Sequence, residues 1–385
     1  MIITGTHQIL AIDLLKASTP DGAAVDAFMR DHTFPIVEGT KVTFVFRGDA
    51  ESVYLKTWVW GLDNSQPLHR LENTNLWYLT LDLPRKSRFE YKLEVVRGGH
   101  GQWIQDPLNK HRAIDPYGAN SVVHGDGYVV PSWTQRDPDA PPGKFEQWVI
   151  KSKAFNERRD FLVYLPARFR KTRRYPLLFV HDGPDYLRFA NLGTVLDNLI
   201  HRLEIPGLIV ACSGTANRFG EYMNDERHAR FVTEEAVPDL EARLPLLGTP
   251  RGRCLMGSSL GGVAAFSTAV RYPGFYSRLL LQSGTFTFTD LGNKSERGEL
   301  VVPIIKFMNR FRENPTLVAE RAFISCGMHE RNIYENRSLV PMLQSTDMEI
   351  RYVESRDGHN WENWRDRLRE GLAWLFPGPL RLVYE

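Results

Sequence analysis

The second part of the chain consists of short, continuous apolar runs, each followed by a loop that contains glycine or serine. Helical stretches separate the runs. Strands that are apolar throughout need cover on both faces, and strands that alternate with helices form parallel sheets. This pattern predicts an α/β fold with a mostly parallel central sheet, whose ligands bind at the carboxyl ends of the strands. The runs are PLLFVHDG (176–183), LIVACSG (208–214), RCLMGSS (253–259), RLLLQSG (278–284) and RAFISCG (321–327), and the main helical stretches are 186–203, 233–247, 260–272, 333–345 and 361–376.

The first part of the chain has a different pattern. Short segments rich in Val, Tyr, Trp and Phe follow one another between turn residues, which predicts an antiparallel β-sandwich. We expect this sandwich within 1–128, with a short helical lead-in, a proline-rich linker at 129–144 and the α/β domain at 145–385. That domain should open with an antiparallel hairpin. The sandwich strands are predicted at 41–48, 53–60, 76–83 and 89–96, and those of the hairpin at 145–152 and 159–167.

The composition excludes several classes of protein. With 48 Lys and Arg against 46 Asp and Glu, the net charge of +2 argues against a dedicated binder of nucleic acid or of anionic membranes. We find no apolar run near the ~20 residues of a membrane span and no signal peptide, so we expect a cytoplasmic protein. Cys212, Cys254 and Cys326 are expected to be buried, reduced thiols. No metal-ligand spacing, P-loop or dinucleotide fingerprint is present, so we expect no metal or cofactor. The oligomeric state is left open.

The strongest motif is GSSLGG, which contains G-x-S-x-G centred on Ser259. An apolar run leads into it and a helical stretch leads out, which is the context of a nucleophile elbow. The alternative is that Ser258 and Ser259 only cap the following helix. We predict that Ser259 is a nucleophile.

A serine hydroxyl needs a base, and a histidine base needs a carboxylate. His359 follows the segment MEIRYVESRDG just before the last helical stretch, so we predict it as the base. Among the other histidines, His181 is expected to shape the loop near the oxyanion site, and His228 to lie in a charged surface segment. Glu330, in the loop after RAFISCG, is the predicted acid, with Asp357 as the other candidate. A surface pair of Glu330 with a nearby arginine is the alternative.

A serine that attacks a carbonyl carbon also needs two N–H groups to hold the oxyanion that forms. We predict Leu260, the residue after the nucleophile, and Gly183 in the loop of VHDGPDY, where Asp182 and Asp185 are the other candidates for the second donor. Asp182 and Arg218 lie in loops at the same sheet edge and are predicted to contact substrate. For Arg218, a surface pair with Glu221 is the alternative.

Six segments stand in the second part of the chain in the order VHDGPDY, NRFGEYMND, LMGSSLGGVAAFSTAVRYPGFY, LLQSG, GMHERNIYENRSL and GHNWENWRDRL. Together they resemble the enterochelin esterase and esterase D branch of the α/β-hydrolases. This resemblance covers about residues 145–385 and implies Ser259 as nucleophile, His359 as base and Glu330 as acid. The front part contains WYLTLDLP, FEYKLEV and WIQDPLNKH. It resembles the immunoglobulin-like E-set domain that precedes such esterases, and its relatives among glycogen-binding modules.

We therefore predict a serine carboxylic-ester hydrolase that works through an acyl-enzyme. The resemblance implies a small-molecule substrate, an aryl or catecholate ester such as an enterochelin-type siderophore trilactone. Feruloyl or acetyl-xylan esters and acyl transfer are the alternatives. A protein of another class, an inactive glycan-binding scaffold, would have a broken triad.

Overall fold

The computed structural model describes residues 9–18, 20–289 and 299–378. The described residues fall into two compact units, one within 1–129 together with 356–358, and the other within 130–355 together with 359–378. None of the described helices combines the length and the apolarity that crossing a membrane requires.

The first unit contains two antiparallel sheets whose inner side chains form one apolar core. The strands predicted from the sequence are confirmed as β2, β3, β6 and β7, while the additional strands are short or polar and lack the expected alternation. The first sheet is β1 (Ile36–Glu38), β2 (Lys41–Arg47), β6 (Leu76–Asp82) and β5 (His69–Arg70). The second is β4 (Ser65–Pro67), β3 (Ser52–Thr57), β7 (Arg88–Arg97), β10 (Gly118–His124) and β9 (Arg112–Asp115), with β8 (His100–Ile104) paired to β7.

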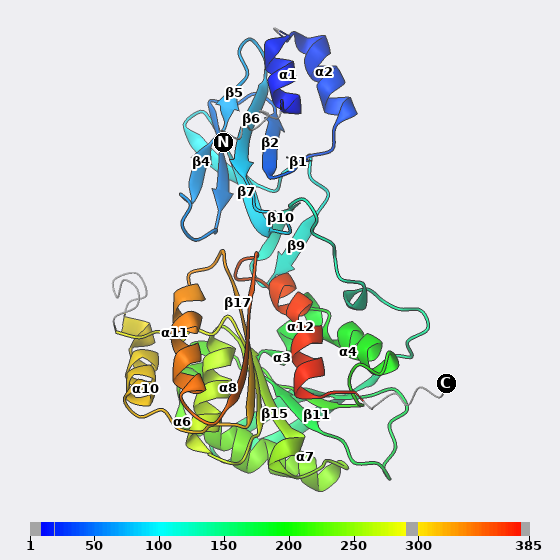
Figure 1. Cartoon of the computed structure of the whole chain (residues 1–385), viewed down its shortest axis with the longest axis vertical. Helices are drawn as coiled ribbons and strands as arrows, with labels where there is room; N and C mark the ends of the chain where they lie inside the picture. The colour runs from blue at the N-terminus through cyan, green and yellow to red at the C-terminus, as the bar shows by residue number, and fades with distance from the viewer. Residues whose placement is uncertain (1–8, 19, 290–298, 379–385) are drawn as a thin grey trace, which may run out of the picture. The chain divides into compact units, whose positions relative to one another are not determined.

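The helical lead-in is also confirmed. Helices α1 (Ala11–Ala17) and α2 (Gly22–Asp31) share an apolar cluster with residues of β2 and β6 (Figure 1). The side chain of Asp21 caps α2 by accepting a hydrogen bond from the N–H of Ala24 at 2.9 Å.

The second unit is built on an eight-stranded sheet in the order β11-β12-β14-β13-β15-β16-β17-β18. The first two strands form the predicted antiparallel hairpin, β12 is antiparallel to β14, and all the later pairs are parallel. The mostly parallel sheet is thus confirmed. Its strands are β11 (Lys144–Ser152), β12 (Glu157–Leu165), β13 (Leu177–Val180), β14 (Ile209–Cys212), β15 (Arg253–Ser258), β16 (Arg278–Gln282), β17 (Arg321–Gly327) and β18 (Glu349–Ser355).

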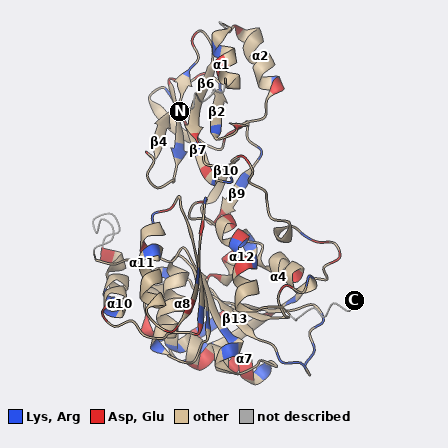
Figure 2. Ribbon diagram, viewed as in Figure 1, with Lys and Arg blue, Asp and Glu red and all other residues tan. Residues whose placement is uncertain are grey.

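Helices cover both faces of this sheet, each over its own apolar core (Figure 1). One face packs against α3 (Gly183–Phe189), α4 (Leu192–His201) and α12 (Trp361–Leu375). The other packs against α5 (Arg218–Tyr222), α7 (Val237–Arg243), α8 (Leu260–Arg271), α10 (Val302–Glu313) and α11 (Ile333–Gln344), with α6 (Glu226–Arg230) beside α8. Positive and negative residues are interspersed along α12 and around α7 (Figure 2).

Two helix predictions were wrong in their bounds. The stretch 186–203 is two helices, because Asn191 adopts a left-handed conformation with φ 48° between α3 and α4. The stretch 233–247 ends earlier, at Arg243, because Leu244 is extended and Pro245 follows it. Its helical region also begins earlier, since a π-helical turn (Phe231–Ala236) joins α6 to α7.

The direction in which the chain adds strands reverses between the neighbouring strands β13 and β15, and this switch point is the expected place for a site. The connection after β13 runs through α3 and α4 on one face, whereas β15 leads into α8 on the other face. Because β13 and β15 are neighbours, their loops lie at the kind of position where open α/β sheets bind ligands, the carboxyl edge at a switch point. The predicted nucleophile and the predicted oxyanion loop both lie at this position.

Candidate active site

Ser259 occupies a sharp turn between β15 and α8. Its backbone has φ 54° and ψ −122°, a conformation that is rare for a residue with a side chain and typical of a nucleophile elbow. A Cβ at Gly257 would lie 2.2 Å from the carbonyl oxygen of Gly261, so the turn can close only around glycine. The Ser259 N–H donates to Gln282 at 2.9 Å, and its carbonyl accepts from Thr285 at 3.2 Å. These bonds fix the elbow to the loop after β16.

His359 and Glu330 contact each other directly. His359 Nδ1 lies 2.6 Å from Glu330 Oε2, and because a carboxylate only accepts, Nδ1 carries the proton. The Glu330 side chain is buried, whereas 38% of the His359 side chain is exposed. A buried carboxylate on Nδ1 fixes the tautomer whose Nε2 can take a proton from a nucleophile.

Glu330 is held by two further donors. Its Oε1 accepts from the Ser283 hydroxyl at 2.6 Å and from the Gly327 N–H at 2.7 Å. Trp364 Nε1 donates to the same Ser283 hydroxyl at 2.9 Å, and the Trp364 ring lies edge-on to the His359 ring at 5.1 Å between centroids. Sequence analysis did not identify Ser283, although LLQSG marks it as a polar residue at a strand end.

Ser259 is linked to this group through Thr285 and Asn332. Ser259 Oγ lies 3.5 Å from Thr285 Oγ1, which Asn332 Nδ2 approaches to 3.3 Å. The same Asn332 nitrogen donates to the Ser283 carbonyl at 2.8 Å. Within the described part of the chain, Ser259 Oγ is hydrogen-bonded to Thr285 and not to His359. Contacts between nucleophile and base are often open without substrate.

The two acids proposed from the sequence have different partners. Glu330 contacts the imidazole, whereas Asp357 accepts hydrogen bonds from Arg88 at 3.1 Å and from the Gly358 N–H at 2.7 Å. Residues 356–358 group with the first unit, which contains Arg88. Of the arginines near Glu330 in sequence, Arg337 pairs with Glu354.

The two predicted oxyanion donors differ in whether their N–H groups are already used for hydrogen bonds within the protein. Leu260 is the first residue of α8, so no carbonyl of an earlier turn of the helix can accept its N–H. The Gly183 N–H instead donates to the Ser213 carbonyl at 2.8 Å, and a Cβ at Gly183 would lie 2.3 Å from the Cys212 Cα. The prediction of Gly183 as second donor disagrees with this geometry, because its N–H is already used to pack the turn against β14.

Asp182 and Arg218 form an ion pair with each other. Arg218 Nε lies 3.0 Å from both carboxylate oxygens of Asp182, and Nη2 lies 2.8 Å from Oδ2. Glu221, the partner of Arg218 in the alternative, bonds Arg159 at 2.8 Å.

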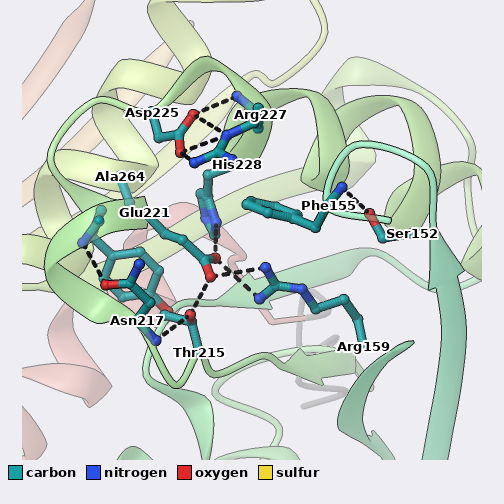
Figure 3. Close-up of polar contacts among 12 residues, drawn as sticks. Ser152, Phe155, Arg159, Thr215, Asn217, Glu221, Asp225, Arg227, His228 and Ala264 are labelled. Atoms are coloured by element: carbon teal, nitrogen blue, oxygen red, sulfur yellow. Dashed lines mark hydrogen bonds and ion pairs between the residues drawn. The ribbon is translucent and has the colours of Figure 1, made fainter. Parts of the chain in front are cut away.

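The placement of His228 at the surface was wrong. His228 is buried, and its Nδ1 lies 3.3 Å from Glu221 Oε2 (Figure 3). A usable signal was present, because helical spacing puts residue 228 on the same face as the apolar Phe231 and Val232.

His181 is fully buried directly before Asp182. Its Nδ1 donates to the Met256 carbonyl at 3.0 Å, and its ring centroid lies 5.2 Å from that of His228. Burial lowers the pKa of His181 from 6.5 to about 3, and repulsion from His228 acts in the same direction. The imidazole is therefore neutral in the folded protein at neutral pH.

This neutral histidine makes stability depend on acid pH. Between pH 6.5 and about 3 the unfolded chain binds a proton that folded His181 does not, so stability falls as the pH falls, by up to about 1.4 kcal/mol per pH unit. We expect His181→Asn to flatten this dependence, measured as the free energy of urea unfolding against pH. His201→Asn, at an exposed end of α4, is the control and should keep the wild-type slope. Equal slopes for all three proteins would contradict the assignment.

Comparison with known proteins gives a match to one family model, and relatives that include enterobactin esterases and an uncharacterized protein. The model of the Esterase family, described as "Putative esterase", matches residues 152–375. The iron(III) enterobactin esterase of Escherichia coli (strain K12) is 24% identical over 341 residues, which cover 81% of this chain and 83% of that protein. An uncharacterized protein, YjcH of Bacillus subtilis (strain 168), is 30% identical over 148 residues, or 37% of this chain and 62% of that protein.

A solved structure shows the same fold. The ferric enterobactin esterase of Salmonella typhimurium superposes with a TM-score of 0.74 at 20% identity, covering 91% of this chain and 98% of that one. At this level of identity the likeness concerns the architecture.

Proposed function

The chain belongs to the Esterase family and is a carboxylic ester hydrolase, and from this premise we propose that Ser259, His359 and Glu330 form its catalytic triad. The observation that carries the proposal is the 2.6 Å contact between His359 Nδ1 and the buried Glu330 carboxylate, at the same sheet edge as the Ser259 elbow. This contact counts against the alternative of an inactive scaffold, for which a broken triad is expected.

The proposed reaction begins when Ser259 turns from Thr285 toward His359. Ser259 Oγ attacks the acyl carbon while His359 Nε2 takes its proton, and the Glu330 carboxylate stabilises the imidazolium that results. The Leu260 N–H, at the positive end of α8, stabilises the oxyanion. His359 then protonates the leaving alcohol. A water activated by the same imidazole hydrolyses the acyl-enzyme and releases the acid.

We propose that the substrate is an aryl or catecholate ester of the siderophore trilactone type. The support is the relationship over most of both chains to the iron(III) enterobactin esterase of Escherichia coli. We further propose that the first unit is an immunoglobulin-like E-set domain, supported by its two antiparallel sheets around one core. A cytoplasmic site of action is consistent with three buried, free cysteines.

A substrate panel tests this assignment. Ferric and iron-free enterobactin, feruloyl esters, acetylated sugars and p-nitrophenyl acetate are compared by kcat/KM, with Ser259→Ala as the control for background hydrolysis. We expect the highest kcat/KM for the enterobactin forms, by about tenfold or more, because substrate classes differ in several pocket contacts of 1–3 kcal/mol each. A higher value for feruloyl or acetyl esters would overturn the substrate class and leave the triad standing.

A further inference from the structure

The loop after β13 is held in place by the short helix α5. Asp182 has a left-handed backbone with φ 54°, which needs support from its surroundings in a residue with a side chain. Arg218, at the start of α5, binds the Asp182 carboxylate at 2.8–3.0 Å. Tyr222, at the end of α5, accepts a hydrogen bond from the Asp182 N–H at 3.2 Å. Both ends of one helix therefore hold one residue of the loop.

This loop touches the helix that begins beside the nucleophile. A Cβ at Gly261 would lie 3.1 Å from Asp182 Oδ2 and 3.3 Å from the His181 Cβ. Arg218 Nη2 also approaches the Ser258 carbonyl at 3.5 Å. A shift of α5 would thus move the loop against the first turn of α8, which carries the Leu260 N–H.

Helix α5 has five residues, too few to be stable by itself. Its Asn217 cap supplies one bond, from the Gly220 N–H at 3.0 Å. The core packing of Tyr222 supplies further support, and so does Glu221, which is 5% exposed and lies between the two residues that hold the loop.

The Glu221 carboxylate is the meeting point of three other elements (Figure 3). Arg159 of β12 donates to both of its oxygens, at 2.8 and 3.1 Å. The Thr215 hydroxyl, in the loop after β14, donates to Oε1, and His228 of α6 lies 3.3 Å from Oε2. Burial opposes the charge on Glu221, but the bonds from His228, Arg159 and Thr215 together lower its pKa to about 2. The carboxylate stays ionised at any pH near neutral.

From these contacts we infer that Glu221 is a positioning residue of the active site: it fixes α5, and α5 fixes the loop of Asp182 opposite the nucleophile elbow. This inference rests on the proposed hydrolysis at Ser259. Glu221 acts only through Arg218 and Tyr222 and touches no reacting atom. In this inference Arg218 and Asp182 support the loop.

The test compares two Arg–Glu pairs at opposite edges of the same sheet, the buried Arg159–Glu221 pair and the partly buried Arg253–Glu241 pair. Glu241 binds Arg253 at 2.7 and 2.9 Å, and Arg253 starts β15, far from the carboxyl edge. We expect Glu221→Gln to lower kcat about 10- to 100-fold, since a displacement of ~1 Å near the reacting atoms can have an effect of this size. KM should change less than about threefold, and the rate of fluorophosphonate labelling of Ser259 should fall with kcat.

Glu241→Gln is the matched control. It should lower the unfolding temperature and leave kcat within about twofold, because it breaks a similar ion pair away from the site. All kinetics are measured below the unfolding transition, checked by near-UV circular dichroism. If kcat of Glu221→Gln matches that of Glu241→Gln, the positioning role is refuted.

Should Glu221→Gln not fold, Tyr222→Phe supplies the result. It removes only the acceptor of the Asp182 N–H and is expected to lower kcat about 3- to 10-fold, the effect of roughly one hydrogen bond. The control Tyr276→Phe removes a hydroxyl bonded to Thr233 at 2.9 Å, and should keep wild-type kcat. Equal kcat for both tyrosine variants refutes the inference. If the proposed function itself is wrong, the result is different: the fluorophosphonate then does not label Ser259 even in the wild-type protein.

Discussion

Replacement of Ser259 by alanine is expected to lower kcat for ester hydrolysis by about 10⁴- to 10⁶-fold, the range for loss of the nucleophile in serine hydrolases. In the proposed reaction the Ser259 hydroxyl forms the acyl-enzyme, so the activity that is left should come from the oxyanion site and substrate binding. Fluorophosphonate labelling should disappear with kcat. Initial rates on the best ester of the panel and intact-protein mass spectrometry measure the two effects.

The adjacent serine supplies the matched control. Ser258 is fully buried at the end of β15, one residue before the elbow. Ser258→Ala removes the same atom from the same segment and should keep kcat within about threefold, because it deletes no group of the proposed reaction. The nucleophile assignment would be refuted by a Ser259→Ala enzyme with more than a hundredth of wild-type activity, or by loss of activity in Ser258→Ala alone.

Replacement of Glu330 by glutamine is expected to lower kcat about 10²- to 10⁴-fold. An amide keeps the volume of the carboxylate but cannot stabilise the imidazolium, and it can donate to Nδ1 and so favour the wrong tautomer. The Ser283 and Gly327 bonds to Oε1 are compatible with a glutamine oxygen, so the fold should persist. The decisive measurement is kcat as a function of pH, together with the unfolding temperature.

The variant Asp357→Asn distinguishes between Glu330 and Asp357, the two candidates for the triad acid. Asp357 pairs with buried Arg88, so the change should lower the unfolding temperature and leave kcat within about fivefold. The reverse outcome, with kcat lost in Asp357→Asn and kept in Glu330→Gln, would transfer the acid role to Asp357.

The sequence contained enough to predict the mostly parallel sheet, because a strand buried on both faces must be apolar throughout. It also predicted the turn at Ser259, since an apolar run, a serine between glycines and a helical stretch stand together. These signals are local. The hairpin at 145–152 and 159–167 was predictable for the same reason, from simple alternation.

Other features depended on residues distant in sequence and could not be predicted. The partner of Asp357 is Arg88, 269 positions away, and nothing near either residue indicates the pair. The Gly183 N–H is taken by a carbonyl from the next strand connection, that of Ser213. Glu221 finds Arg159 62 positions earlier in the chain. Backbone and side-chain partners of this kind follow from packing, which the linear pattern does not encode.

The three buried cysteines can be used to detect local opening of the central sheet. Cys212, Cys254 and Cys326 lie buried in β14, β15 and β17, and burial raises the pKa of all three thiols, that of Cys212 to about 12. A thiol that is neither exposed nor ionised does not react with maleimide or iodoacetamide. Alkylation at each position therefore reports when its own strand separates from its neighbours, and mass spectrometry can order the three events. In the folded protein a fluorophosphonate should therefore label Ser259 while the thiol reagents label none of the three cysteines, so both reagents can be used on one sample.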